Sequence, residues 1–151
     1  MADIYLGLKK KDKGTYLLVL KLKKDEKIRP GKLREITFRQ GIYLYIGRAR
    51  RALQGRLNRH LREEKKLFWH IDYFLQKAST EEVWIKRDFL DECGIIQKVK
   101  SLLKDAVFPV EKFGSSDCGC KSHLIYLPRN KAILKSLREK LSFEKVNING
   151  D

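Results

Sequence analysis

The sequence lacks the features that mark membrane proteins and small secreted proteins. No apolar run approaches the ~20 residues that a membrane-spanning helix needs. Residues 1–14 place their charges after a short apolar piece instead of before a long one, which is unlike a signal peptide. Three cysteines, an odd number, argue against a disulfide scaffold. We therefore expect a cytoplasmic protein that does not associate with membranes.

Acidic residues are scarce relative to basic ones. The chain has 34 Lys and Arg but 19 Asp and Glu, which gives a formal net charge of +15. A basic excess of this size is typical of proteins that bind nucleic acid. The alternative is a basic protein whose lysines are only solvated.

Internal repeats and low-complexity linkers are absent as well. A chain of 151 residues has the usual size of one domain, and its 42% hydrophobic content supports a folded core. We expect a single domain over residues 1–141, followed by a flexible tail over residues 142–151.

Apolar patterns and turn signals predict strands before helices. Strands are predicted at residues 14–24, 33–38, 42–47, 81–88 and 123–127. Helices are predicted at residues 52–64, 67–78, 88–108 and 128–141, with Asp88 capping the third. The first three strands have short connections, one of them a Pro30–Gly31 turn, which favours an antiparallel meander. The expected fold class is α+β, a small antiparallel sheet with a three-stranded core flanked by helices.

The strand Gly41–Gly47 presents two different faces. Side chains alternate along a strand, so the aliphatic residues at positions 42, 44 and 46 share the face expected to join the core. Tyr43 and Tyr45 share the other face, where Gly47 leaves room for close approach. That face can carry a site, or the two tyrosines can simply pack beneath a helix.

The helix predicted at residues 52–64 has an apolar stripe with basic residues beside it. Leu53, Leu57 and Leu61 form the stripe, and Arg56 and His60 border it rather than lying opposite. We therefore expect both side chains to lie against the edge of the sheet instead of in open solvent.

A dense group of basic residues surrounds this helix and predicts a phosphate-binding surface. Besides Arg56 it comprises Arg48, Arg50, Arg51, Arg59, Arg62, Lys65 and Lys66.

Glu92 stands in the middle of an apolar helical stripe. Ile96, Val99 and Leu103 lie within about 40° of it on a helical projection. The cost of burying a charged carboxylate must be compensated. Compensation could come from a hydroxyl, a salt bridge to Arg56, the dipole of the first helical turn or a divalent metal. Carboxylate oxygen suits a hard cation that also contacts phosphate.

Two further groups of residues have alternative interpretations. His70 and Asp72 either support an active site or hydrogen-bond the backbone as structural residues, and the structural role is favoured. The residues Cys93, Cys118, Cys120 and His123 could bind Zn²⁺, although paired Cys-x-x-Cys knuckles are missing. The turn with Ser115 and Ser116 is more strongly expected to offer hydroxyl and N–H groups to a phosphate.

Taken together, these residues resemble the GIY-YIG nuclease superfamily. Gly14–Tyr16 is similar to its first motif, with Thr in place of Ile, and Tyr45–Gly47 matches the second. Arg56 and His60 stand where that superfamily has an Arg and often a His. The closer resemblance is to a branch of small archaeal and bacterial domains, sometimes fused to a helix-hairpin-helix DNA glycosylase. It is carried by blocks at residues 68–75, 92–93 and 113–124 and covers residues 14–127.

The resemblance implies an endonuclease that hydrolyses DNA, with a role in repair and a repair glycosylase as a partner. It implies that Glu92 holds one Mg²⁺ or Mn²⁺, that Tyr16 acts as a base and that Tyr45 positions the water. DNA rather than RNA rests on the resemblance, because phosphate contacts do not distinguish the two. The superfamily's late Asn has no clear counterpart, and Ser116 or Asp117 stands in its place.

The chemistry of phosphodiester hydrolysis matches these residues. It requires a base that activates water, and Tyr16 or Tyr45 can supply it with assistance from His60. It also requires a cationic group on the phosphate oxygens, which Arg56 can supply. A phenol with a pKa near ~10 must have it lowered by nearby cations to act as a base at neutral pH. The alternatives are a non-catalytic nucleic-acid-binding module and a zinc-stabilised adaptor for a repair enzyme.

Overall fold

The computed structural model describes residues 7–114, 120–128 and 130–148. Its strands are β1 (Gly14–Leu22), β2 (Glu26–Ile28), β3 (Ile36–Phe38), β4 (Gly41–Ala49), β5 (Ser79–Arg87), β6 (Leu124–Leu127) and β7 (Glu144–Val146). Its helices are α1 (Leu53–Leu61), α2 (His70–Leu75), α3 (Glu92–Leu102), the 3₁₀ turn η1 (Lys131–Ile133) and α4 (Leu134–Leu141). Within these residues, no helix is both long and apolar enough to cross a membrane.

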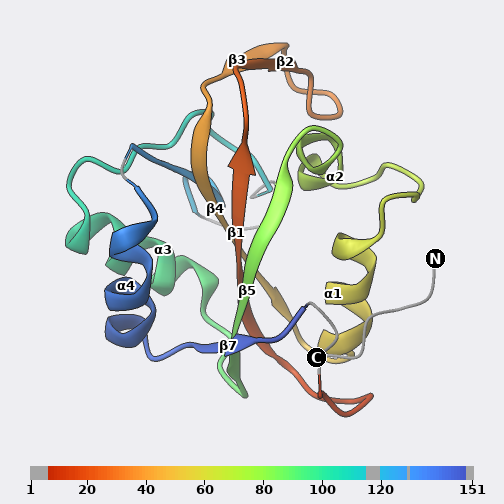
Figure 1. The fold of residues 1–151 in the computed structure, drawn as a ribbon. Coiled ribbons are helices and arrows are strands. Elements are labelled where there is room, and N and C mark those ends of the chain that lie inside the picture. The colour runs from red at the N-terminus through yellow and green to blue at the C-terminus, as the bar shows by residue number, and fades with distance from the viewer. Residues whose placement is uncertain (1–6, 115–119, 129, 149–151) are drawn as a thin grey trace.

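The fold is α+β, as expected, but its sheet is larger than the expected three-stranded core. Five antiparallel strands are arranged in the order β6-β4-β1-β5-β7. The predicted meander is wrong because β3 pairs with β2 in a separate hairpin, while β1 pairs directly with β4. Residues 23–40 therefore form an excursion between two long central strands (Figure 1).

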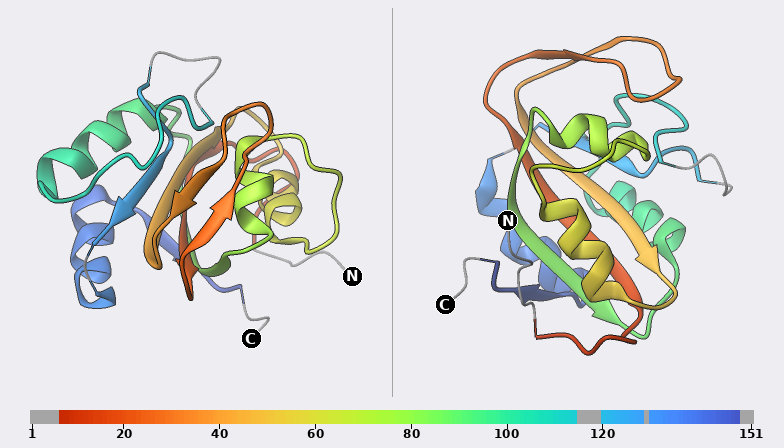
Figure 2. Two further views of the ribbon diagram at one scale, coloured as in Figure 1. Left: turned by 90° about the horizontal axis from the view of Figure 1, so that it is seen from above. Right: turned by 90° about the vertical axis from the view of Figure 1, so that its right-hand side faces the viewer.

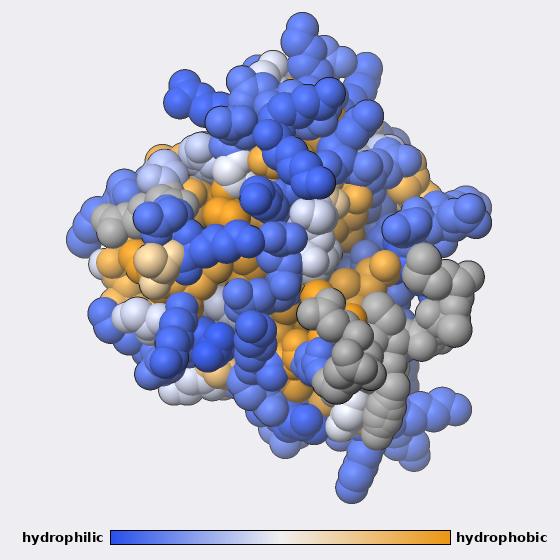
Figure 3. All heavy atoms as spheres, in the orientation of Figure 1, coloured by the Kyte–Doolittle hydropathy of each residue, from blue (hydrophilic) through white to orange (hydrophobic). Residues whose placement is uncertain are grey.

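Helices cover both faces of the sheet. Figure 2 shows α1 and α2 on one side and α3 and α4 on the other. The strands have buried side chains on both faces, which explains why β1 reads as a nearly continuous apolar run. Hydrophilic side chains dominate the outer surface seen in Figure 3, with apolar atoms exposed in the gaps between them. This surface agrees with the high net charge of the chain.

The helix predicted to start after Asp88 begins later. Strand β5 continues to Arg87, and Asp88 adopts a left-handed backbone with φ of 60°. Asp91 caps α3 instead, because its side chain accepts a hydrogen bond from the Gly94 N–H at 2.9 Å. Thr15 holds the intervening segment on β1, since its hydroxyl donates to the Phe89 carbonyl at 2.6 Å. The strand that carries Tyr16 therefore also fixes the start of α3.

The C-terminal segment extends the sheet. Strand β7 pairs with β5, and Phe143 is buried against Trp84 with ring centroids 6.2 Å apart. The expectation that a flexible tail begins at residue 142 is therefore wrong for residues 142–146. In the sequence, the position of the apolar Phe143 just beyond the last helix indicated that this segment packs on the core.

Candidate active site

One cavity of about 580 Å³ gathers side chains from distant segments of the chain. Residues of β1, β4, α1 and the start of α3 line it, together with the segment before α2. Its lining includes Tyr16, Tyr45, Arg48, Arg56, Trp69 and Glu92. The structure thus brings together four of the five residues expected to be catalytic, and the fifth, His60, lies directly behind them.

Glycine at two positions makes room for the tyrosine rings. Tyr16 faces Gly47 across the β1–β4 pair, and a Cβ added to Gly47 would lie 2.5 Å from the Tyr16 hydroxyl oxygen. Gly114 has φ of 71°, and a Cβ there would lie 3.2 Å from the Tyr45 hydroxyl oxygen. The close approach expected at Gly47 is therefore made by the ring of Tyr16 itself.

Tyr16 and His60 form a buried hydrogen-bonded pair. The Tyr16 hydroxyl oxygen lies 2.8 Å from His60 Nε2, and both residues are at most 2% exposed. Burial raises the pKa of Tyr16 well above its usual range, although the Arg56 guanidinium opposes that rise. Burial also lowers the pKa of His60 to about 3, and the neighbouring Lys65 charge adds to the effect. Both rings are therefore neutral at pH 7.

The expected lowering of the tyrosine pKa by nearby arginines does not occur. Burial also raises the pKa of Tyr45, with a further contribution from Tyr16 and only partial opposition from Arg56. Desolvation disfavours the charged phenolate more strongly than the arginine favours it. A free tyrosinate is therefore not the resting form of either residue.

Arg56 occupies the edge position expected from the helical pattern. It is half-buried, its Nη1 donates to the Arg48 carbonyl at 3.0 Å, and its guanidinium lies 4.8 Å from the centre of the Trp69 ring. The carbonyl and the ring hold the guanidinium in the cavity wall.

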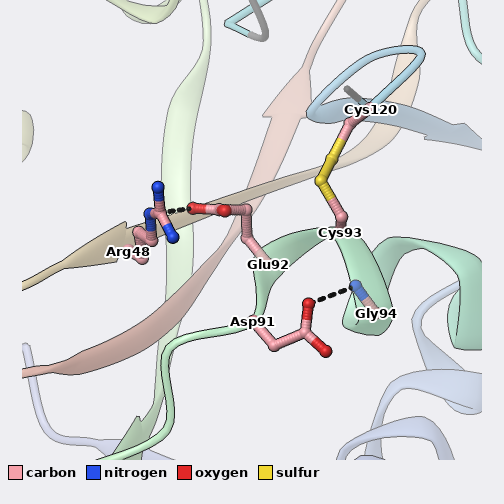
Figure 4. The surroundings of a disulfide bond; sticks show 6 residues. All are labelled: Arg48, Asp91, Glu92, Cys93, Gly94 and Cys120. Atoms are coloured by element: carbon pink, nitrogen blue, oxygen red, sulfur yellow. Dashed lines mark hydrogen bonds and ion pairs between the residues drawn. A yellow bond between two sulfur atoms is a disulfide. The ribbon is translucent and has the colours of Figure 1, made fainter. Parts of the chain in front are cut away.

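Glu92 is buried, as expected, but its partner is Arg48 rather than Arg56. The Glu92 side chain is 8% exposed, and its Oε2 lies 3.2 Å from Arg48 Nε. Glu92 is the first residue of α3, where the helix dipole also favours negative charge. Alternation along β4 turns Arg48 toward the layer of α3, where it points at Glu92 (Figure 4). Arg56 belongs to α1, which lies in the opposite layer.

The basic residues expected to bind phosphate divide into two groups. Arg50 and Arg51 are exposed and line the cavity, and Arg62 and Lys66 are exposed beyond it. Arg59, in contrast, donates from both terminal nitrogens to the Asp72 carboxylate at 2.8 Å each.

Lys65 also has a structural role. Its Nζ donates to the carbonyls of Arg59 and His60, at 3.0 and 2.7 Å, at the end of α1. It therefore helps to satisfy the last carbonyls of α1, of which that of Arg59 also accepts the Arg62 N–H at 3.4 Å. Arg59 and Lys65 are thus engaged in contacts within the protein, which the sequence did not predict.

His70 and Asp72 both hydrogen-bond the backbone, in agreement with the structural interpretation. His70 Nδ1 accepts the Gly114 N–H at 2.8 Å, and Asp72 accepts the N–H groups of Phe68 and Trp69 at 2.9 Å each. Burial tends to raise the pKa of Asp72, but these N–H groups and Arg59 hold it below its ordinary value. His70 lines the cavity in addition to supporting the loop at Gly114.

The cysteines form a bond that the sequence did not predict. Cys93 and Cys120 are joined by a disulfide, with Cα atoms 5.6 Å apart, so the expectation against disulfides is wrong for this pair. Glu92 and Cys93 point in different directions, one toward Arg48 and the other toward Cys120 (Figure 4). His123 lies near both sulfurs, with ligand atoms within 4.8 Å of one another. In the disulfide state these sulfurs are not thiolates, so they do not form the expected zinc site.

Four other residues expected to contribute lie outside the described residues, namely Ser115, Ser116, Asp117 and Cys118. Sequence reasoning missed the role of Thr15 in fixing the start of α3 and that of Trp69 as a platform for Arg56. It also missed His123 as a cavity residue. The aromatic pair at residues 68–69 beside an arginine-rich helix was the signal that could have identified Trp69.

Comparison with known proteins identifies the family of the chain. Residues 15–145 match the family model of DUF123, a domain of unknown function, and the chain belongs to this family. The match includes every residue placed in the cavity above. No curated protein and no solved structure matches the chain.

Proposed function

We propose that this DUF123 domain is a metal-dependent endonuclease that hydrolyses phosphodiester bonds in DNA, related to the GIY-YIG nucleases. The observation that carries the proposal is the meeting of Glu92, Arg56 and the rings of Tyr16 and Tyr45 in one cavity. A buried acid, a guanidinium and two phenols are more than phosphate binding requires, whereas hydrolysis can use each of them. The net charge of +15 and the exposed arginines at the cavity favour a polyanionic substrate.

The residues of the cavity fit a hard divalent cation at Glu92. The guanidinium of Arg48, 3.2 Å from the carboxylate, demonstrates that a cationic group can approach this side chain. Mg²⁺ is commonly bound by one or two carboxylates together with substrate phosphates, so Glu92 suits Mg²⁺ or Mn²⁺ as a protein ligand. Such an ion, when bound, would neutralise charge on the phosphate oxygens.

The hydrogen bond between Tyr16 and His60 gives a route for the proton of the attacking water. Both groups are neutral at pH 7, so the Tyr16 hydroxyl can pass its own proton to His60 Nε2 while it accepts one from water. This transfer requires the tautomer of His60 in which Nε2 is the acceptor. It avoids a free tyrosinate but forms an imidazolium at His60, which burial also disfavours, and the negative charge that develops on the nearby phosphate offsets this cost.

Arg56 is positioned to stabilise the negative charge that develops on the phosphate. A guanidinium has five N–H donors, so the bond to the Arg48 carbonyl leaves capacity for a phosphate oxygen. The contact with Trp69 fixes its orientation before substrate arrives. A group fixed in this way costs little reorganisation during the reaction.

A non-catalytic nucleic-acid-binding module is the second candidate. The observation that favours it is the ion pair between Arg48 and Glu92, which compensates the buried carboxylate without a metal. The zinc-stabilised adaptor is less favoured because two of its four expected ligands form a disulfide. Roles in DNA repair and with a glycosylase partner rest on the GIY-YIG resemblance.

A nicking assay separates these candidates. Wild-type protein is incubated with supercoiled plasmid and with branched DNA in Mg²⁺, Mn²⁺ or a chelator. We expect cutting with either metal and none with the chelator. Retained DNA binding with no cutting in either metal would overturn the nuclease proposal and leave the binding module.

A further inference from the structure

Phe68 is an exposed aromatic ring on the wall of the cavity. It is 74% exposed, compared with 46% for Val107 and 37% for Leu102, the other large apolar residues exposed in the described part of the chain. Unlike Arg56 or Glu92, it has no part in the hydrolysis proposed above. A single exposed apolar residue is common at protein surfaces, but this ring stands on the wall of a cavity that four arginines also line.

The backbone around Phe68 is held in place. The N–H groups of Phe68 and Trp69 both donate to Asp72 Oδ2 at 2.9 Å, and Arg59 pairs with the same carboxylate. The Phe68 ring lies 6.0 Å from the Trp69 ring, between centroids, at an angle of 55°. A fixed segment therefore presents the apolar ring to solvent.

The surroundings of Phe68 restrict the ligand that could cover it. The guanidinium groups of Arg56 and Arg59 lie 4.8 and 4.3 Å from the centre of the Trp69 ring, and Arg50 and Arg51 line the same cavity. A ligand for this wall must offer a flat apolar face within reach of negative charge. An unpaired nucleotide has both, because its base has an open π-face and its phosphate is an anion.

A paired base within duplex DNA does not offer such a face, since both of its faces are covered by its neighbours in the stack. Aromatic side chains instead stack on the unpaired bases of single-stranded nucleic acid. Nucleic-acid enzymes that need access to a base commonly act on single strands or on a base removed from the stack.

We infer that Phe68 stacks on an unpaired base beside the phosphate bound in the cavity, so that the substrate class is nucleic acid with a single-stranded nucleotide at a fork, flap or gap. This inference rests on the proposed function for the position of the phosphate. Stacking of this kind selects a substrate by the presence of an unpaired base rather than by the base sequence, because every base has a π-face.

The test measures binding in the presence of a chelator, so that the substrate stays uncut. Fluorescence anisotropy compares a forked DNA with a fully paired duplex of equal length, for wild type and for Phe68→Ala, Phe68→Leu and Phe68→Trp. We expect the wild type to prefer the fork and Phe68→Ala to bind the fork about 5- to 100-fold more weakly, with duplex binding unchanged. Phe68→Trp should retain the preference and Phe68→Leu should lose it, because only the ring can stack.

A second readout follows the base directly. With 2-aminopurine at the unpaired position next to the junction, stacking on Phe68 should quench the fluorescence of the bound fork, and Phe68→Ala should remove the quench. Leu102→Ala is the matched control, because it removes an exposed apolar side chain outside the cavity lining. Thermal unfolding checks that each variant is folded.

Three results would overturn the inference: equal fork binding by wild type and Phe68→Ala, an equal loss on fork and duplex, or full retention by Phe68→Leu. The last two would indicate a general apolar contact rather than stacking. Neither readout depends on cutting. A ring-dependent preference for forks without any nicking would therefore reject the nuclease proposal and keep this one.

Discussion

The two faces of the central sheet are both buried, yet buried tyrosine side chains occur on only one of them in the part of the chain that the structure describes. On β4, residues 42, 44 and 46 pack against the layer of α3 and α4 as aliphatic side chains. Tyr43 and Tyr45, which alternate with them, pack against the layer of α1 and α2. Each buried hydroxyl on that second face needs a partner, and an aliphatic side chain does not.

The choice of partner separates a structural tyrosine from a candidate catalytic one. The Tyr43 hydroxyl donates to the Arg39 carbonyl at 2.6 Å, a group that cannot titrate. The Tyr16 hydroxyl pairs with the ring of His60, which can accept or donate a proton. Burial, which is similar for the two tyrosines, does not distinguish them.

Among the tests of this comparison, the largest difference in cutting rate is expected when the hydroxyl of each tyrosine is removed in turn. If the proposed proton route is correct, Tyr16→Phe should slow cutting by about 10²- to 10⁴-fold, the usual contribution of a general base. Tyr43→Phe should leave the cutting rate close to that of the wild type. Single-turnover cleavage at saturating DNA measures both variants, and equal rates for the two would remove the distinction.

The pH dependence of stability gives the next largest effect. The folded pKa of His60, about 3, lies below its unfolded value near 6.5, so between these pH values the unfolded chain binds the proton and the folded chain does not. The free energy of unfolding should therefore be full above pH 6.5 and fall as the pH drops toward 3. The loss from this one residue reaches up to ~5 kcal/mol.

Urea unfolding at pH 7, 5 and 4 measures this dependence. The His60→Gln variant should show a shallower loss of stability than wild type, because it lacks the titrating ring. Parallel pH profiles for the two proteins would show that His60 is not buried in its neutral form.

The smallest expected effect is on the salt dependence of DNA affinity when one exposed arginine is replaced. Arg51→Gln should reduce the slope of log affinity against log salt concentration by about one, because one phosphate contact is lost. Lys98→Gln is the matched control, since it removes one exposed charge from α3 outside the cavity lining. An equal change in both variants would mean that net charge, rather than the cavity surface, attracts DNA.

Alternation and helical periodicity predicted the parts of the site that depend on neighbouring residues. They indicated the two faces of β4, the edge position of Arg56 and the burial of Glu92, and the structure confirms all three. A residue's face and burial follow from its own element, so a local pattern is sufficient to predict them.

Features that depend on strand register were beyond the sequence. The crossing of Tyr16 over Gly47 and the pairing of Arg48 with Glu92 require β1 to pair directly with β4. The meander predicted from short connections placed another strand between them. The bond from Cys93 to Cys120 likewise joins segments 27 residues apart that only the tertiary fold brings together.

The most direct test of the reaction centre compares Glu92→Gln with Glu139→Gln, an exposed residue of α4 that receives the same loss of charge. For each variant, the single-turnover cutting rate in Mn²⁺ and the DNA affinity are measured together. We expect Glu92→Gln to abolish cutting with affinity retained and Glu139→Gln to match the wild type. Wild-type cutting by Glu92→Gln would contradict the proposed role of this carboxylate.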